Sequence, residues 1–281
     1  MGNDKVRSHF ERLAEQGVWA SLYNAPEERI TSENWSFLIR VRRVMELLGE
    51  HCGTGDVLDI GCGTAPIARG VVAMGRKYLG MDFSPEMVKS AQEQNREIVE
   101  SGRARIQVGG ATGIAFPNQR AGAVIAMGVL EYLTVEQIQK TLREIQRVLQ
   151  PSGVALLTIP KRRHWSKLVL SALYPVRWAI RWRPSRENLL LERAEEFRRI
   201  YLMPAELDAL CREASLAKID QRSYNFELFG RPLTLVAPRL SYLMNRPFEG
   251  LGSRGGSFFC TGYIGAYRPG RSTQSVGDRS S

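Results

Sequence analysis

Short apolar runs alternate with amphipathic stretches through the middle of the chain. The apolar runs are found at residues 57–60, 78–82, 105–108, 123–127 and 154–159. Apolar runs of this length, separated by helical patterns, are typical of parallel strands joined by crossover helices. The pattern therefore predicts an α/β fold with a doubly wound, mostly parallel sheet. In such a sheet we expect a ligand to lie at the carboxyl ends of the strands.

The first 50 residues have a helical pattern instead. Apolar positions recur at helical spacing from Trp35 and Leu38 onward until Gly49, and an earlier aromatic cluster includes Trp19 and Tyr23. The spacing predicts an N-terminal group of helices. Most of these aromatic residues are expected to be core, with Tyr23 and Trp35 as candidate substrate contacts.

A glycine turn after the first predicted strand carries the clearest chemical signal. Gly61 and Gly63 allow a sharp turn and a close approach of the backbone to a ligand, and Asp82 follows the second strand about 20 residues later. A carboxylate there can accept both hydroxyls of a ribose. A dinucleotide fingerprint needs a third glycine where Pro66 stands, and no phosphate loop with a Gly-Lys-Ser/Thr ending is present. The turn thus indicates a nucleoside cofactor other than NAD or ATP.

Four segments in order resemble the class I S-adenosylmethionine-dependent methyltransferases. They read DIGCGT at 59–64, DFSPEM at 82–87, VIAMGVLEYL at 124–133 and LREIQRVLQPSG at 142–153. The resemblance implies a Rossmann-like sheet of seven strands with an antiparallel last strand, and S-adenosyl-L-methionine as the cofactor. Because four motifs occur in register, a chance glycine turn is a poor explanation.

The resemblance also implies roles for single residues. Asp59 would help to hold the ammonium group of the cofactor, Asp82 its ribose, and Phe83 with Met87 its adenine. The full set of cofactor-binding residues implied is Asp59, Gly61, Cys62, Gly63, Asp82, Phe83, Ser84, Met87, Ala111, Thr112, Met127 and Gly128. Two positions depart from the pattern of the family: Ala65 often is a further glycine, and Gly110 often is an aspartate that binds the adenine.

The resemblance also extends to the rest of the chain, where it implies a helix at 204–216 and strands at 218–227 and 257–267. Two stretches, 161–203 and 228–256, exceed the minimal pattern, and such insertions beside strand ends form substrate pockets. The resulting organisation is a helical cap at 1–50, a cofactor-binding core at 51–160, substrate-side insertions with the sixth strand at 161–256, the last strand at 257–267, and a polar, disordered tail at 268–281.

Methyl transfer needs alignment of the acceptor more than acid or base help. Glu131 and Tyr132 are the polar groups expected nearest to the departing methyl group. A phenol or alcohol acceptor would gain from a base, and His164 is the best placed of the three histidines. These three residues are the catalytic candidates. Arg199 and Tyr201 join the candidate acceptor contacts.

The net charge of +10 is concentrated in one segment. Residues 161–186 hold eight Lys or Arg and no acid, interleaved with three tryptophans. We rank three interpretations: a lid over the pocket, a peripheral contact with an anionic membrane on its inner face, and an RNA surface. The apolar run is too short to span a bilayer and is interrupted by Pro175 and Arg177.

The four cysteines lack metal-ligand spacing, so neither zinc nor a disulfide framework is expected. The charged N-terminal residues argue against a secretion signal, and we expect a cytoplasmic protein. The sequence thus predicts methyl transfer to a small organic or lipid-like acceptor, with oxygen as the favoured target atom. The alternatives are an RNA methyltransferase and a protein that binds S-adenosylmethionine without catalysis.

Overall fold

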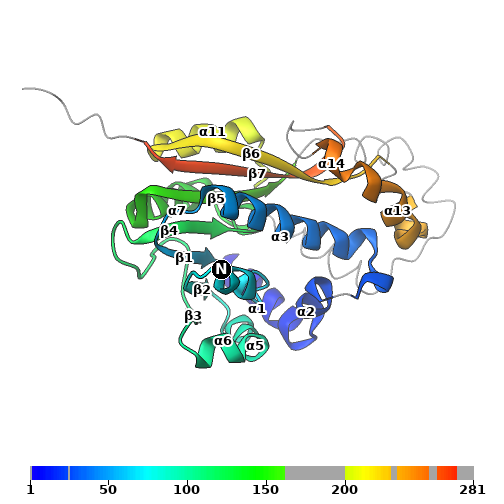
Figure 1. Ribbon diagram of the computed structural model, residues 1–281, viewed down its shortest axis with the longest axis horizontal. Helices are drawn as coiled ribbons and strands as arrows, with labels where there is room; N and C mark the ends of the chain where they lie inside the picture. The colour runs from blue at the N-terminus through cyan, green and yellow to red at the C-terminus, as the bar shows by residue number, and fades with distance from the viewer. Residues whose placement is uncertain (1, 25, 162–199, 229–232, 253–257, 271–281) are drawn as a thin grey trace, which may run out of the picture.

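A computed structural model describes residues 2–24, 26–161, 200–228, 233–252 and 258–270 (Figure 1). These residues form a seven-stranded sheet in the order β3-β2-β1-β4-β5-β7-β6. Neighbouring strands from β3 to β5 are parallel, whereas β7 is antiparallel to both β5 and β6. The predicted fold class is confirmed. The strands are β1 (Asp56–Ile60), β2 (Tyr78–Asp82), β3 (Ala104–Val108), β4 (Ala121–Ala126), β5 (Leu149–Pro160), β6 (Leu216–Phe226) and β7 (Cys260–Pro269).

Helices α5 (Pro85–Gln94) and α7 (Val135–Val148) begin after residues whose side chains cap them, Ser84 and Thr134. Before α7, Thr134 accepts a hydrogen bond from the Gln137 amide, and the Gln137 side chain accepts one from the Thr134 amide. This reciprocal pair satisfies two amides that the first turn leaves unpaired. The described helices are α1 (Gly2–Glu15), α2 (Val18–Tyr23), η1 (Glu27–Arg29), α3 (Ser32–His51), α4 (Ala68–Ala73), α5 (Pro85–Gln94), α6 (Arg96–Glu100), η2 (Leu130–Tyr132), α7 (Val135–Val148), α11 (Pro204–Glu213), α12 (Leu233–Val236), α13 (Pro238–Asn245), η3 (Arg246–Phe248) and α14 (Glu249–Gly252).

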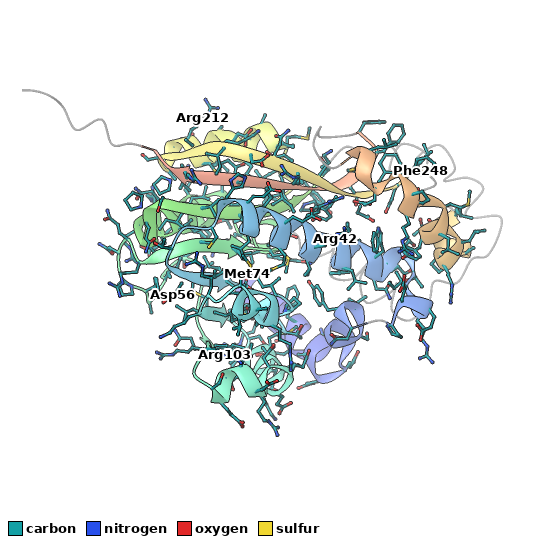
Figure 2. The ribbon with its side chains drawn as sticks, viewed as in Figure 1. Arg42, Asp56, Met74, Arg103, Arg212 and Phe248 are labelled. Atoms are coloured by element: carbon teal, nitrogen blue, oxygen red, sulfur yellow. The ribbon has the colours of Figure 1, made fainter. Side chains whose placement is uncertain are left out.

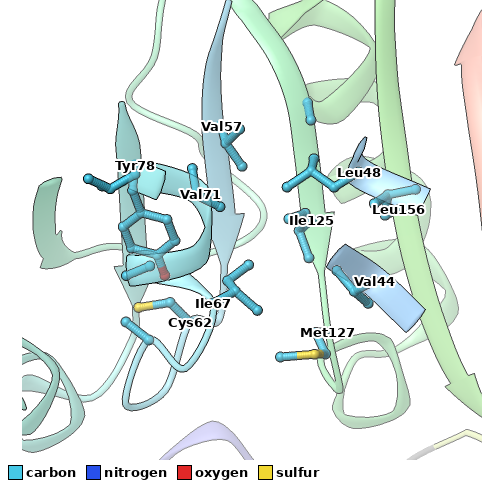
Figure 3. Close-up of a cluster of buried hydrophobic side chains, with 14 of the residues drawn as sticks. Val44, Leu48, Val57, Cys62, Ile67, Val71, Tyr78, Ile125, Met127 and Leu156 are labelled. Carbon is cyan, nitrogen blue, oxygen red and sulfur yellow. The ribbon is translucent and has the colours of Figure 1, made fainter. Parts of the chain in front are cut away.

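Helices cover both faces of the sheet. On one face Val44 and Leu48 of α3 lie against Ile125 and Leu156 of the central strands (Figure 3). On the other face α7 and α11 bury their apolar stripes. Because each large apolar side chain contributes roughly 1.5–3 kcal/mol when fully buried, these two clusters hold the strand ends in fixed positions.

The ends of three predicted elements are corrected. The helix from Pro204 stops at Glu213, because Ser215 adopts a positive φ of 58° and the chain then enters β6. The last strand begins at Cys260 instead of residue 257, since Phe258 and Phe259 form a turn. The same strand continues to Pro269, so the predicted tail at 268–281 starts too early.

Candidate functional site

The glycine turn is attached to the end of the neighbouring strand. The amides of Gly61 and Cys62 both donate to the carbonyl of Met81, at 2.7 and 3.0 Å. Gly61 and Gly63 have positive φ values of 64° and 54°, which glycine adopts without steric cost. A Cβ at Gly63 would meet no atom within 4 Å, so open space borders the turn there. The turn therefore offers room for a ligand against its backbone.

Ala65 completes the turn in a strained conformation. Its φ is 54°, the left-handed region that costs an L-residue roughly 1–2 kcal/mol. This is the position at which the resemblance implies a further glycine. The departure from the family pattern thus leaves the shape of the turn intact and adds strain to it.

Asp82 braces the turn from β2. Its Oδ2 accepts from the Gly63 amide at 2.9 Å, and its Oδ1 accepts from the Ser84 amide at 3.0 Å. The side chain is almost fully buried, and burial raises the pKa of its carboxyl, with the backbone hydrogen bonds opposing that effect. Each carboxylate oxygen keeps a second lone pair. Asp82 can therefore hold the turn and still accept hydrogen bonds from ligand hydroxyls.

Asp59 lies on the same face of the sheet, completely buried. Its Oδ2 accepts from the Tyr78 hydroxyl at 2.7 Å, while its Oδ1 has no hydrogen-bond partner among the described residues. Burial raises the pKa of its carboxyl to about 7; the Tyr78 hydrogen bond opposes this effect, and the charge of Asp82 adds to it. An unpaired buried carboxylate oxygen is suited to a nearby cationic group. Tyr78 was not anticipated from the sequence, where it reads as one apolar position of a strand.

The predicted adenine contacts divide into an exposed and a buried group. The ring of Phe83 is 36% exposed at the end of β2, where a flat ligand can reach it. Ser84 is fully buried, and its hydroxyl accepts from the Met87 amide at 3.3 Å as the N-cap of α5. Cys62 and Met127 belong to the apolar cluster that supports the turn. In this structure Cys62, Ser84 and Met127 are thus buried residues that support the site and do not line its surface.

The loop after β3 begins beside Asp82, since the Gly109 amide donates to the Asp82 carbonyl at 2.9 Å. Ala111 and Thr112 follow and are partly exposed. Gly110 is exposed, and a Cβ there would meet nothing within 4 Å. The loop could therefore accommodate the aspartate that the family pattern has at this position.

An aromatic residue of α1 connects the two sides of the site. The ring of Phe10 lies edge-on to Phe83 at 6.1 Å and to Tyr132 at 5.1 Å between ring centroids. Helix α1 also packs against α5. Phe10 thus contacts both the expected adenine side and the expected methyl side. Nothing in the helical pattern of the N-terminal residues singled it out.

The loop after β4 joins the glycine turn to α3. A Cβ at Gly61 would collide with the side chain of Val129. The preceding residue, Gly128, has a φ of 75°, and a Cβ there would lie 3.0 Å from Nη1 of Arg40. Its amide also donates to Thr158 at 2.9 Å. The Arg40 guanidinium therefore lies at the carboxyl end of β4, one loop away from the turn.

Four polar residues surround this point and are named the Arg40 cluster: Tyr23, Arg40, Glu131 and Tyr224. The Nη2 of Arg40 donates to the Tyr23 hydroxyl at 2.8 Å, and its guanidinium carbon lies 5.1 Å from the centre of the Phe37 ring. Burial alone would lower the pKa of Arg40, but the neighbouring Tyr23, Tyr224 and Glu131 raise it above its ordinary value. Burial raises the pKa of Tyr224. At neutral pH the cluster therefore holds a cation beside a neutral phenol.

The remaining predicted substrate and catalytic residues lie in different places. Trp35 packs against Tyr242 at 5.2 Å between ring centroids, which joins α3 to α13. Tyr201 lies in a segment that meets η2, because the Ile200 amide donates to the Glu131 carbonyl at 3.3 Å. His164 and Arg199 fall outside the described residues. The structure thus brings Tyr23, Glu131, Tyr132 and the Tyr201 segment to one end of the sheet.

At the other end of α3, His51 is half-buried. Its Nε2 lies 3.0 Å from Asp220, and Arg222 pairs with Glu50 at 2.7 Å. Glu50, His51 and Asp220 could together approach a metal ion. Because Arg222 also pairs with Asp220, these carboxylates already have a cation, and the group is explained as an ion-pair network between α3 and β6.

The model of a methyltransferase domain matches residues 57–153, the region that holds the turn, Asp82 and the Gly128 loop. Residues 57–153 are therefore a methyltransferase domain of the kind found in class I S-adenosylmethionine-dependent methyltransferases. The resemblance seen in the sequence is confirmed, and with it S-adenosyl-L-methionine as the cofactor.

Curated relatives agree over the same region. A probable S-adenosylmethionine-dependent methyltransferase of Mycolicibacterium smegmatis is 29% identical over 133 residues, covering 47% of this chain and 48% of the relative. A demethylmenaquinone methyltransferase of Symbiobacterium thermophilum is 28% identical over 153 residues, covering 53% and 56%. The chain thus spans about half the length of these relatives.

The fold extends over more of the chain than the sequence similarity. The crystal structure of magnesium protoporphyrin IX methyltransferase from Synechocystis PCC 6803 with bound SAH superposes with a TM-score of 0.63 at 14% identity, covering 95% of this chain and 99% of that one. A possible histamine N-methyltransferase from Thermotoga maritima superposes with a TM-score of 0.60 at 15% identity, covering 94% and 99%. At these identities the likeness concerns the fold alone.

S-adenosylmethionine fits the residues present. The free space at Gly63 would receive the methionine part of the cofactor. The unpaired oxygen of Asp59 would supply the counter-charge for the ammonium group of that methionine. Asp82 would bind the ribose hydroxyls, and Phe83 would lie against the adenine. Gly110 leaves the adenine amino group without the acceptor that the family pattern supplies.

Proposed function

We propose that this protein transfers the methyl group of S-adenosylmethionine to an oxygen of a small organic or lipid-like acceptor. One observation carries the proposal: the Gly128 loop contacts the glycine turn through Val129 and the Arg40 cluster through Gly128 itself. A cofactor held by the turn and an acceptor held by the cluster would be neighbours. Such an arrangement supports direct transfer between two bound molecules.

Bound S-adenosylmethionine supplies an electrophilic methyl group, which an acceptor oxygen takes with its lone pair while the electrons of the broken bond stay on sulfur. The chain contributes position and protection from water. Asp82 would fix the ribose end, and Phe10 would close the space between Phe83 and Tyr132. Glu131, buried beside the acceptor end, is the described residue best placed to receive the proton of an acceptor hydroxyl.

The names of two relatives support a lipid-like acceptor, and one of those names supports oxygen as the target atom. Besides the demethylmenaquinone methyltransferase, a ubiquinone biosynthesis O-methyltransferase of Azorhizobium caulinodans is 27% identical over 124 residues, covering 43% of this chain and 47% of the relative. Quinone precursors are apolar molecules with acidic hydroxyls. A peripheral contact with the inner face of a membrane would bring the protein to such acceptors, and we extend the proposal to a cytoplasmic location with this contact.

The described residues add a second observation for that contact. Leu240 and Leu243 of α13 are about half exposed, and Leu251 of α14 is 76% exposed. The exposed Arg239 and Arg246 flank them. Apolar side chains beside arginines suit an anionic lipid surface. In the part of the chain that the structure describes, no helix is long and apolar enough to cross a membrane.

The test is a transfer assay with methyl-labelled S-adenosylmethionine and cell extract separated into membrane and soluble fractions. We expect label in a product that partitions into organic solvent, and protein that sediments with the membrane fraction at low salt. Label in RNA would favour the alternative supported by a similarity to a probable tRNA methyltransferase 9B of Bos taurus, which is 28% identical over 130 residues. Calorimetric binding of S-adenosylmethionine without any labelled product would favour a protein that binds the cofactor but does not catalyse transfer.

A further inference from the structure

Arg40 differs in its partner from two other arginines that are buried or half-buried, Arg147 and Arg222. Arg147 and Arg222 form ion pairs with glutamates at 2.8 and 2.7 Å. Arg40 donates to a phenol, and no carboxylate of the described residues forms an ion pair with it. Its Nε is shielded from solvent and has no hydrogen-bond partner among those residues. A cation taken out of water without a close anion is costly, and such groups are concentrated at functional sites.

The donors around Arg40 converge where an acceptor would lie. A guanidinium has five N–H donors. One is donated to Tyr23, and Arg40 also has a side-chain hydrogen bond with Tyr224. Because the Tyr23 oxygen accepts that bond, its own proton remains available for another oxygen. Tyr224 faces the same guanidinium from β6. Glycine at position 128 lets the guanidinium lie close to the loop after β4, since a Cβ there would be 3.0 Å from Nη1.

We infer that the Arg40 cluster binds an anionic oxygen of the acceptor, so that the acceptor is a phenol, an enol or a carboxylic acid bound in its ionised form. The inference rests on the proposed function and names its substrate class. The carboxylate of Glu131 acts on Arg40 through its charge but does not form an ion pair with it. Its negative charge compensates the charge of the guanidinium when no acceptor is bound. On binding, the acceptor oxygen replaces it as the close counter-charge, and the acceptor proton passes to Glu131 or to water.

The experiment uses 4-nitrophenol, whose absorbance reports its own ionisation, and the protein saturated with S-adenosylhomocysteine. We expect the apparent pKa of bound 4-nitrophenol to fall by about one unit or more, as an opposite charge within a few ångströms produces. Benzoate is the second probe, and its competition with 4-nitrophenol distinguishes a carboxylate from a phenolate ligand. The neutral 4-nitroanisole is the ligand control and should compete weakly.

The deciding variant is Arg40→Met, which keeps the length of the side chain and removes its charge. It should abolish the pKa shift and weaken benzoate binding about tenfold. Arg40→Lys should retain part of the shift, and Tyr23→Phe should reduce it. The matched control is Arg42→Met on the same helix, because the Arg42 side chain is 68% exposed (Figure 2). This control should leave the shift unchanged.

Three outcomes would overturn the inference: no pKa shift in the unmodified protein, an equal shift in Arg40→Met, or no binding of either probe at millimolar concentration. Affinity for S-adenosylhomocysteine reports the fold and the cofactor site separately. If that affinity is normal and the shift is missing, the substrate class is wrong while the methyltransferase proposal stands. Should Arg40→Met fail to fold, Arg40→Lys and Tyr23→Phe decide the same question through smaller changes, and an undiminished shift in both would overturn the inference.

Discussion

The proposed cofactor half and the proposed acceptor half of the site are built in different ways. The cofactor half consists of backbone amides and two acids within 26 residues of sequence, counted from Asp59 to Ser84. The acceptor half takes Tyr23 from α2, Arg40 from α3, Glu131 from η2 and Tyr224 from β6. The first half is local in sequence and the second is assembled by the tertiary fold. A cofactor site of fixed chemistry can thus be joined to acceptor residues that vary independently.

Among the changes considered, replacement of Asp82 should reduce S-adenosylmethionine affinity the most. Asp82→Ala removes the acceptor of two backbone amides and of the proposed ribose bonds. Hydrogen bonds to a charged group contribute about 1.5–3 kcal/mol each, so we expect S-adenosylmethionine affinity to fall by about 100-fold or more in calorimetry. Benzoate binding to the Arg40 cluster should change far less.

Asp56→Ala is the matched control, because Asp56 stands at the opposite end of β1 and is only partly buried. Asp82→Asn, which keeps one acceptor oxygen, should lie between the two. An Asp82→Ala protein that is folded and binds S-adenosylmethionine normally would show that the turn does not hold the cofactor.

This difference explains what the sequence could reveal. Gly61, Gly63 and Asp82 can be predicted because the turn and the acid that braces it lie in two motifs, 59–64 and 82–87, which are about 20 residues apart. Ala65 shows the limit of that reasoning: its identity departs from the pattern, yet its φ of 54° is the one the turn requires. The amino acid at position 65 therefore differs from the family pattern, whereas the backbone conformation at this position does not.

The acceptor half could be only partly predicted. Tyr23 and Glu131 were among the candidates, but Arg40 reads as one polar position of an amphipathic helix. Its burial follows from its position against the loop after β4, where Gly128 has a left-handed φ, and the sequence around Arg40 does not determine this contact. Tyr224 is likewise one alternating position of a strand. Only tertiary packing makes these residues a group.

A smaller effect concerns Asp59 and pH. Because burial raises the pKa of this carboxyl to about 7, the free protein holds Asp59 mostly protonated below that pH. A ligand ammonium group favours the ionised form, so S-adenosylmethionine affinity should rise with pH, by about tenfold from about pH 6 to about pH 8. The free protein should show the opposite trend: the stability that protonated Asp59 contributes is fully present below its ordinary pKa and is lost as pH rises through about 7.

Asp59→Asn should remove both trends, in calorimetry for affinity and in denaturant titrations for stability. Asp56→Asn, on the same strand, should keep them. The ligand's own titration is common to all variants and cancels in the comparison. If Asp59→Asn retains the full pH dependence of affinity, then Asp59 is not the counter-charge of the ammonium group and its burial serves the fold through Tyr78.

The smallest expected effect is an increase in S-adenosylmethionine affinity, obtained by adding the acid that the family pattern has in the cofactor half. Gly110→Asp adds the carboxylate that the family pattern has at this position, and an added Cβ meets no atom within 4 Å. One hydrogen bond to the adenine amino group contributes on the order of 1 kcal/mol, so S-adenosylmethionine affinity should rise about fivefold. Gly113→Asp adds the same charge to the same loop, also into open space, and should leave affinity unchanged. An equal gain in both variants would indicate a general charge effect, and no gain at Gly110 would mean that the adenine lies away from this loop.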